Sequence, residues 1–320
     1  MRRLFAIFLA FVIFAGTAIP VNTAQASQPD WETAMNRALD WIHTTAAPNY
    51  YAGAEWAILA LARSGRVSAD DLWIGAWLAS LEDIQLRRKT DYQRVTIALT
   101  SLGFDASDFK GRDFTEPYRI FVPNAQRHAM NRAINTDIYA LIALDTKPYD
   151  GEREQFIQSL LDSQRANGTW GLLPSLPASA LDLDVTAMAV QALAPYYHSN
   201  PAVAAAVDTA LRWLRRQAFP NPEGTAQMIT ALTALGPAFA DEAKHYINWL
   251  LRWFDPASGR FRRPATTSPV NFMATEQAAY ALVSYWRLIN GLTSLYDMSD
   301  VFFDGREFDG REEDSHDEEI

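Results

Sequence analysis

Apolar, alanine-rich segments recur along the chain at nearly regular intervals. Each runs for eight or nine residues and carries few charges, which is typical of a helix buried on all sides. The last residues of successive segments lie 41 to 50 positions apart, enough for two helices and two turns. The segments are Ala54–Leu61, Arg94–Leu102, Asp137–Leu144, Thr186–Leu193, Gln227–Leu235 and Gln277–Tyr285.

Amphipathic segments alternate with the apolar ones and are candidates for an outer layer of helices. They are Trp31–His43, Asp70–Ile84, part of Thr115–Arg132, Glu152–Ser163, Ala202–Arg216 and Asp241–Phe254. The third is the weakest candidate because Pro117 and Pro123 interrupt it. Six inner and six outer helices predict an all-α chain closed into an α/α toroid. An open solenoid of the same helix pairs is the alternative.

The clearest helix pair lies between residues 152 and 197. Its first helix ends before Gly168, where a left-handed C-cap favours glycine. Its second helix starts near Asp182 or Asp184, since either side chain can cap a helix N-terminus. Pro195 ends that second helix.

Two motifs in this pair resemble those of a known family. Gln164-x-x-x-Gly168-x-Trp170 resembles the QW motif of the squalene cyclase and prenyltransferase repeat family. Asp182-Leu-Asp184-Val-Thr186-Ala187 resembles the DxDDTA motif of class II terpene cyclases, with Val185 in place of the last aspartate. The resemblance covers about Trp31 to Met298 and implies an α/α toroid with a cavity at one end. The same superfamily includes cobalamin-binding proteins and domains of secreted bacterial surface proteins. The chain is most similar to the secreted, repeat-only members.

The two ends of the chain differ in composition from the rest. Residues 1–26 contain Arg2, Arg3, an apolar run and a small-residue cleavage site, which predict a signal peptide and secretion to the cell envelope or outside. A retained anchor is the alternative, although a membrane span needs about 20 apolar residues. Residues 27–298 form the predicted toroid. Residues 299–320 predict a disordered acidic tail, because residues 300–320 contain ten acidic side chains and only two arginines.

Charge and residue usage exclude several classes of partner and site. Without the signal peptide the net charge is −12 and no basic stripe exists, so nucleic acid is a poor partner. The chain has no cysteine, so it lacks a ligand of the zinc site that protein prenyltransferases of this family use. The five histidines are scattered, which gives no support for a metal or a catalytic triad. We therefore predict no metal and no cofactor.

Two enzymatic interpretations follow from the acidic residues. In a class II terpene cyclase, Asp184 would protonate an alkene with Asp182 as its neighbour, but Val185 leaves the carboxyl cluster incomplete. A role of both aspartates in starting the helix is the simpler interpretation. A glycan-processing α/α barrel would use two carboxylates and aromatic platforms. Its candidates are Asp91, Asp137, Asp184 and Glu276 with Tyr50, Tyr51, Trp170 and Phe261, and no pair is singled out by its spacing.

Ligand binding at one concave end of the toroid is the interpretation that we favour. Polar groups at the starts of the inner helices would surround that end, where ligands usually bind. The candidate binding residues are Tyr51, Asp91, Arg94, Asn135, Asp137, Trp170, Gln227, Glu276 and Gln277. The ligand would be small and hydrophobic or corrinoid-like, or the partner would be a protein. Cobalamin-binding relatives hold their ligand against a β-rich domain that this pattern does not predict, so a corrinoid would require a partner protein.

Overall fold

The computed structural model describes residues 30–46, 53–123, 133–173, 182–263 and 272–303. The prediction of an all-α chain is confirmed, because most of these residues are helical. Strands in the described part are limited to the antiparallel pair β1 (Phe254–Asp255) and β2 (Arg260–Phe261). A helix with the length and apolarity needed to cross a bilayer does not occur within these ranges.

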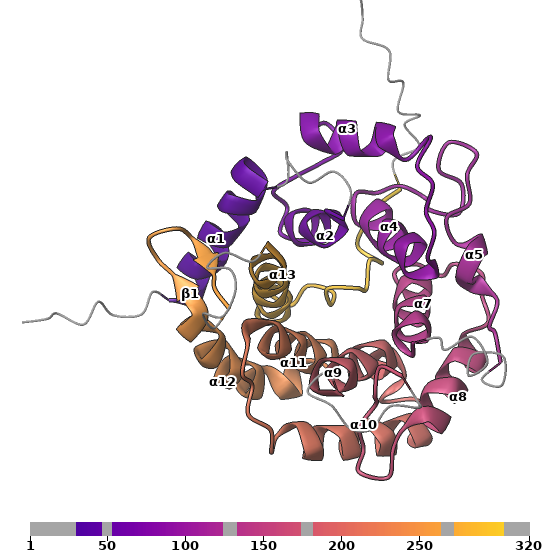
Figure 1. Ribbon diagram of the computed structural model, residues 1–320, viewed down its shortest axis with the longest axis vertical. Coiled ribbons are helices and arrows are strands. Elements are labelled where there is room, and N and C mark those ends of the chain that lie inside the picture. Colours follow the sequence, from indigo (N-terminus) through magenta and orange to yellow (C-terminus); the bar gives the residue numbers. More distant parts are fainter. Residues whose placement is uncertain (1–29, 47–52, 124–132, 174–181, 264–271, 304–320) are drawn as a thin grey trace, which may run out of the picture.

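The apolar segments form an inner layer of helices (Figure 1). Neighbours in sequence order contact each other, and α13 also contacts α2, so the series returns to its start. These inner helices are α2 (Glu55–Arg63), α4 (Lys89–Ser101), α7 (Asn135–Asp145), α9 (Asp182–Leu193), α11 (Pro222–Ala234) and α13 (Phe272–Ile289).

The amphipathic segments lie outside the inner layer (Figure 1). These outer helices are α1 (Trp31–Trp41), α3 (Leu72–Ser80), α5 (Glu116–Arg119), α8 (Arg153–Ser163), α10 (Pro201–Leu214) and α12 (Ala240–Leu250). One π-helical turn (Ile42–Ala46) follows α1, and short 3-10 turns are η3 (Ala194–Tyr196), η4 (Pro237–Phe239) and η5 (Leu251–Trp253). As expected from Pro117, α5 has only a single turn.

The hydrophobic core lies between the two layers and around each inner helix. Every residue of α11 from Pro222 to Thr233 is buried, as the apolar pattern predicts. Several inner helices begin earlier than the apolar segments, since α4 starts at Lys89 and α9 at Asp182. The added first turns carry carboxylates, which the positive end of the helix dipole stabilises. Their side chains therefore gather at the end of the molecule where the inner helices begin.

The QW-like turn links three helices. Gly168 has a φ of +91°, and the Gln164 side chain donates hydrogen bonds to the carbonyl oxygens of Gly168 (3.1 Å) and of Ala206 on α10 (2.8 Å). Trp170 has no exposed surface, and its Nε1 donates to the carbonyl oxygen of Leu160 on α8 (2.7 Å). Its backbone N–H donates to the hydroxyl of a threonine near the start of α9 (3.0 Å). The turn therefore ties α8 to α9 and α10.

A second turn repeats this geometry without the glutamine. Gly259 has a φ of +71°, and Phe261, like Trp170, has no exposed surface. The backbone N–H of Phe261 donates to the hydroxyl of Thr275 near the start of α13 (3.1 Å), just as Trp170 bonds to Thr186. The shared glycine and buried aromatic residue indicate that the two turns are versions of one structural unit.

We expect Gly168→Ala to lower the free energy of unfolding by about 2–4 kcal/mol, because it adds backbone strain and a steric clash. An added Cβ would lie 2.8 Å from the backbone oxygen of Thr209. Gly65 also has a positive φ but nothing within 4 Å of such a Cβ, so Gly65→Ala should cost only about 1–2 kcal/mol. Urea unfolding of both variants measures the difference. Equal losses would contradict the contribution of the clash.

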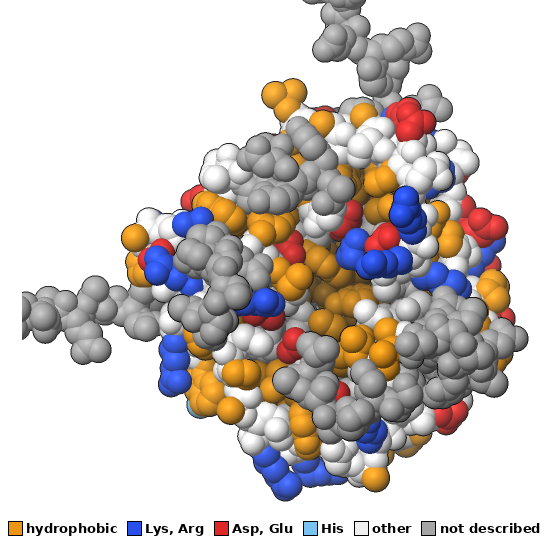
Figure 2. All heavy atoms as spheres, viewed as in Figure 1, with side chains coloured by type: hydrophobic (Ala, Val, Ile, Leu, Met, Phe, Trp, Pro, Cys, Tyr) orange, Lys and Arg blue, Asp and Glu red, His pale blue; other side chains and the backbone are white. Residues whose placement is uncertain are grey.

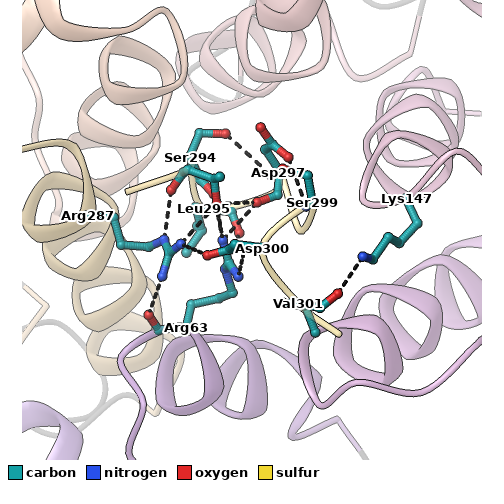
Figure 3. A network of polar contacts seen from close by, with 10 residues as sticks. Arg63, Lys147, Arg287, Ser294, Leu295, Asp297, Ser299, Asp300 and Val301 are labelled. Carbon is teal, nitrogen blue, oxygen red and sulfur yellow. Dashed lines mark hydrogen bonds and ion pairs between the residues drawn. The ribbon is translucent and has the colours of Figure 1, made fainter. Parts of the chain in front are cut away.

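A C-terminal segment, residues 290–303, continues from α13 across the end where the inner helices finish (Figures 1 and 3). The sequence assigns everything after residue 298 to a tail, yet Asp300 pairs with Arg63 and Arg287, and the Val301 carbonyl accepts a hydrogen bond from Lys147. Both arginines are nearly buried, so Asp300 supplies the carboxylate that their charges need. The predicted signal peptide and residues 304–320 lie outside the described residues.

Candidate ligand-binding hollow

The inner helices begin around a hollow in one face of the molecule. Figure 2 shows hydrophobic side chains in its depth and charged side chains near its edge. On the otherwise buried inner helices, partly exposed side chains face this centre, and we define the hollow by them. They are Trp56 on α2, Arg94 on α4, Asn135 and Tyr139 on α7, Asp184 and Met188 on α9, and Gln277 on α13.

Aromatic side chains from three inner helices meet below the edge of the hollow. The ring of Trp56 lies 5.4 Å from that of Tyr139 and 6.1 Å from that of Tyr280, centroid to centroid. The Tyr139 hydroxyl contacts the sulfur of Met188 at 3.4 Å. Burial raises the pKa of Tyr139 above its ordinary value, so its hydroxyl stays neutral at physiological pH. The depth of the hollow is therefore apolar, aromatic and uncharged.

A chain of amide side chains runs across three inner helices and ends at the hollow with Gln277. Nε2 of Gln227 donates to Oε1 of Gln277 (3.1 Å) and to the Tyr280 hydroxyl (2.6 Å). Nε2 of Gln191 in turn donates to Oε1 of Gln227 (2.8 Å). Gln227 is nearly fully buried, whereas Gln277 retains exposed surface. Gln277 is thus the member of this chain that offers polar atoms to a ligand in the hollow.

Glu276 is the most perturbed carboxyl group at this end. It is 5% exposed, and its Oε2 has no hydrogen-bond partner among the described residues. Burial and then the neighbouring carboxylate of Glu55 raise the pKa of Glu276 to about 8, against the opposing effect of Arg94. The group is therefore mainly a neutral acid at pH 7, able to donate a proton in a hydrogen bond.

Asp184 has a second raised pKa. Burial and then the charge of Glu223 raise it to about 6, while Arg263 acts in the opposite direction. Glu223 itself is 3% exposed and forms an ion pair with Arg263. Asp184 is thus ionised for the most part at pH 7 and becomes neutral in mildly acidic conditions.

Arg94 is the cation that lies among these acids on the α2 and α4 side. Its Nη2 lies 3.0 Å from Oδ1 of Asp91, and its Nε lies 3.4 Å from Oε2 of Glu55. Burial raises the pKa of Glu55, and Arg94 opposes that rise. The guanidinium is therefore shared by two carboxylates and retains a partly exposed face toward the hollow.

The structure brings together seven of the residues predicted for binding or catalysis. Each lies in the first two turns of an inner helix. The starts of these helices share one end of the molecule, which brings the residues together (Figure 1). The seven are Asp91, Arg94, Asn135, Asp184, Gln227, Glu276 and Gln277. Tyr51, like Tyr50, lies outside the described residues.

Four predicted residues do not belong to the hollow. Trp170 and Phe261 have no exposed surface, because each fills the space under its turn between the layers. Asp137 accepts a hydrogen bond from Ser159 on α8 (2.8 Å) and so faces the outer layer. Asp182 forms an ion pair with Arg165 in the QW-like turn. The contacts of these four residues between the layers give no support for a ligand-binding or catalytic role.

The side chains that give the hollow its apolar depth are not among the residues predicted from the sequence. Tyr139 and Met188 lie four residues after the predicted Asn135 and Asp184, so each shares a helix face with a predicted residue. Trp56 lies in the first turn of α2. The i to i+4 spacing from each polar residue was the signal that would have found the first two.

Within the described ranges, no group of three or more His, Cys, Asp or Glu side chains is arranged to hold a metal ion. Comparisons with protein-family models and with curated proteins give no match for this chain.

Proposed function

We propose that the protein is a secreted α/α toroid of the prenyltransferase and squalene oxidase repeat type that binds a ligand in its hollow without transforming it. The contact between α13 and α2 supports a closed toroid over an open solenoid. The turn around Gly168 supports the repeat type, because Gln164 and Trp170 make the interhelical contacts expected of a QW motif.

The main support for a binding function is a set of partly exposed side chains on inner helices that are otherwise buried. Trp56, Tyr139 and Met188 retain surface where their helix neighbours have none. A partly exposed aromatic and sulfur-containing surface gains free energy when an apolar ligand displaces water from it. We therefore propose a small, mainly hydrophobic ligand whose polar end meets Gln277 or the carboxyl groups at the edge. A corrinoid or a protein partner is an outcome that ligand identification would reveal.

A class II terpene cyclase is the alternative, because aromatic rings below Asp184 are the surroundings that such an enzyme needs. The weak acidity of Asp184 argues against a cyclase. Protonation of an alkene needs an unusually strong acid, whereas burial and Glu223 make Asp184 a weaker acid than an ordinary aspartate. Val185 supplies no carboxyl group beside Asp184, and Asp182 forms an ion pair with Arg165.

A variant that fills the hollow tests the proposed binding. We expect the neutral apolar dye Nile red to bind the wild-type protein saturably, with a rise in its fluorescence. Met188→Trp adds volume inside the hollow and should weaken binding at least tenfold. Leu72→Trp is the matched control, because Leu72 is 94% exposed on α3. Equal affinity of the wild type and Met188→Trp for the dye would rule out the hollow as its site.

Turnover distinguishes the proposal from the cyclase alternative. Purified protein incubated with squalene or polyprenyl diphosphates should give no product by gas chromatography and mass spectrometry. Formation of a product that Asp184→Asn abolishes would establish the cyclase and overturn the proposal.

A further inference from the structure

A pocket of about 560 Å³ lies at the end opposite the hollow. It is formed by the last turns of α7, α9 and α11 and by the C-terminal segment. Sites for small organic molecules usually have volumes of roughly 300–1,000 Å³. The pocket is therefore large enough for such a molecule.

Most of the pocket wall is apolar. Ile142, Ala192, Pro195 and Ala234 come from the inner helices and η3, and Tyr296 comes from the C-terminal segment. Tyr296 is nearly buried, and burial raises its pKa above the ordinary value, so the hydroxyl is neutral. A ligand here would bury an apolar body.

Three of the four charged side chains of the wall bond to other groups of the protein, and the fourth, Asp297, is exposed and accepts a hydrogen bond from the backbone N–H of Ser299 (3.0 Å). Arg153 donates to Oδ1 of Asp145 (2.7 Å) and to the carbonyl oxygen of Tyr149 (2.6 Å). The Tyr196 hydroxyl donates to Oδ2 of Asp145 (2.8 Å). Lys147 donates to the carbonyl oxygen of Val301. A ligand therefore does not need a charge to bind in this pocket.

Among the described residues of the wall, Gln191 is the buried side chain with one polar atom that lacks a hydrogen-bond partner. It is 3% exposed, and its Nε2 donates to the backbone carbonyl oxygen of Gln227 (3.0 Å), which can only accept. This contact assigns the nitrogen and oxygen of the amide. Oε1 of Gln191 then has no hydrogen-bond partner among the described residues. Buried acceptors are normally satisfied, so this one points to a missing donor.

The direction of the amide chain explains why an acceptor is left over. Gln191 donates to Gln227, and Gln227 donates to Gln277, so each amide uses its N–H₂ group toward the hollow. The acceptor end of the chain therefore lies at the pocket. Pro195 adds to the shortage of donors, since it has no N–H to offer the carbonyl four residues earlier on α9.

We propose that this pocket is a second binding site, separate from the hollow, for a small organic molecule with an apolar body and one N–H donor. The body packs against Ile142, Ala234 and Tyr296, and the N–H donates to Oε1 of Gln191.

Two arginines hold the part of the pocket wall that the C-terminal segment forms. Asp300 accepts from Arg63 (2.8 Å) and from Arg287 (2.6 Å), and both arginines are nearly buried (Figure 3). Arg63 also donates to the carbonyl oxygens of Leu295 (3.1 Å) and Asp297 (2.8 Å), on either side of Tyr296. Because the wall is fixed before a ligand arrives, binding does not have to order it.

Indole and 1-methylindole test the proposal with full-length protein, since 1-methylindole has the same ring system with a methyl group in place of the N–H hydrogen. We expect ligand-observed NMR titrations to show indole binding about five to ten times more tightly, as one hydrogen bond to a buried acceptor implies. Equal affinities, tighter binding of 1-methylindole, or binding of neither probe would overturn the proposal.

Two variants locate the bound indole. Ala234 is half-buried at the end of α11, so Ala234→Trp fills the pocket and should weaken indole binding at least tenfold, while circular dichroism checks that it folds. Met188→Trp fills the hollow and should leave indole affinity within twofold of the wild type. Loss of binding in Met188→Trp with retention in Ala234→Trp would place indole in the hollow and refute a second site.

Discussion

Replacing Glu276 with glutamine should stabilise the protein at pH 8 and leave its stability nearly unchanged at pH 4.5. Glutamine resembles the protonated acid, which is the form that burial and Glu55 favour in the folded protein. We expect the free energy of unfolding of the variant to exceed that of the wild type by about 4 kcal/mol at pH 8. Urea unfolding at pH 4.5, 6 and 8 measures this divergence.

The sign follows from the two pKa values of Glu276. In the unfolded chain the carboxyl has its ordinary pKa of 4.5, and in the folded protein the pKa is about 8. Between these values the folded state binds more protons than the unfolded state, so the free energy of unfolding falls as pH rises. The slope is about 1.4 kcal/mol per pH unit for one group. Below pH 4.5 both states are protonated and the effect vanishes.

An exposed glutamate provides the control for this prediction. Glu116 lies on the surface of α5, so Glu116→Gln should change stability by less than about 0.5 kcal/mol at each pH. If Glu276→Gln lowers stability equally at all three pH values, its carboxyl is ionised in the folded protein and the assigned environment is wrong.

Replacing Trp170 with alanine should lower the free energy of unfolding by about 3–5 kcal/mol. The side chain has no exposed surface, so the change leaves a large cavity, and it also removes the hydrogen bond to Leu160. Trp170→Phe keeps most of the packing and should cost about 1–3 kcal/mol, chiefly through the carbonyl left without its donor. Guanidinium unfolding monitored by circular dichroism measures both variants.

A half-buried tryptophan on an outer helix serves as the comparison. Trp213 on α10 retains exposed surface, and we expect Trp213→Ala to cost clearly less than Trp170→Ala. A smaller loss for Trp170→Ala than for Trp213→Ala would show that the QW-like turn contributes little to stability.

The order of inner and outer helices could be predicted because a buried helix is apolar on every face, whereas a half-buried helix is apolar on one face. Segments such as Thr186–Leu193 are apolar on every face, and segments such as Ala202–Arg216 on one face only. Those patterns matched α9 and α10 to within a few residues. The starts of inner helices were harder to place, because the first turn of α4 is polar and resembles a loop.

The candidate site was predicted in its polar part and missed in its apolar part. Polar residues stand out within apolar helices, so Asp184 and Gln277 could be identified from their positions. Apolar residues such as Tyr139 and Met188 look like core in sequence, and only their exposed surface in the folded chain marks them as lining. Trp170 shows the converse, since an aromatic residue that the sequence suggests for ligand binding is fully buried.

The sequence by itself determined the all-α class, the alternation of buried and amphipathic helices, and the end at which the polar residues gather, because these depend on local periodicity and helix capping. Tertiary structure decided which side chains retain surface, which carboxyls lose their solvent, and how Arg63 and Arg287 hold Asp300. Such properties arise from contacts between residues up to 237 positions apart, and they set the electrostatic energy of each group through burial and partners. No local pattern in the chain encodes them.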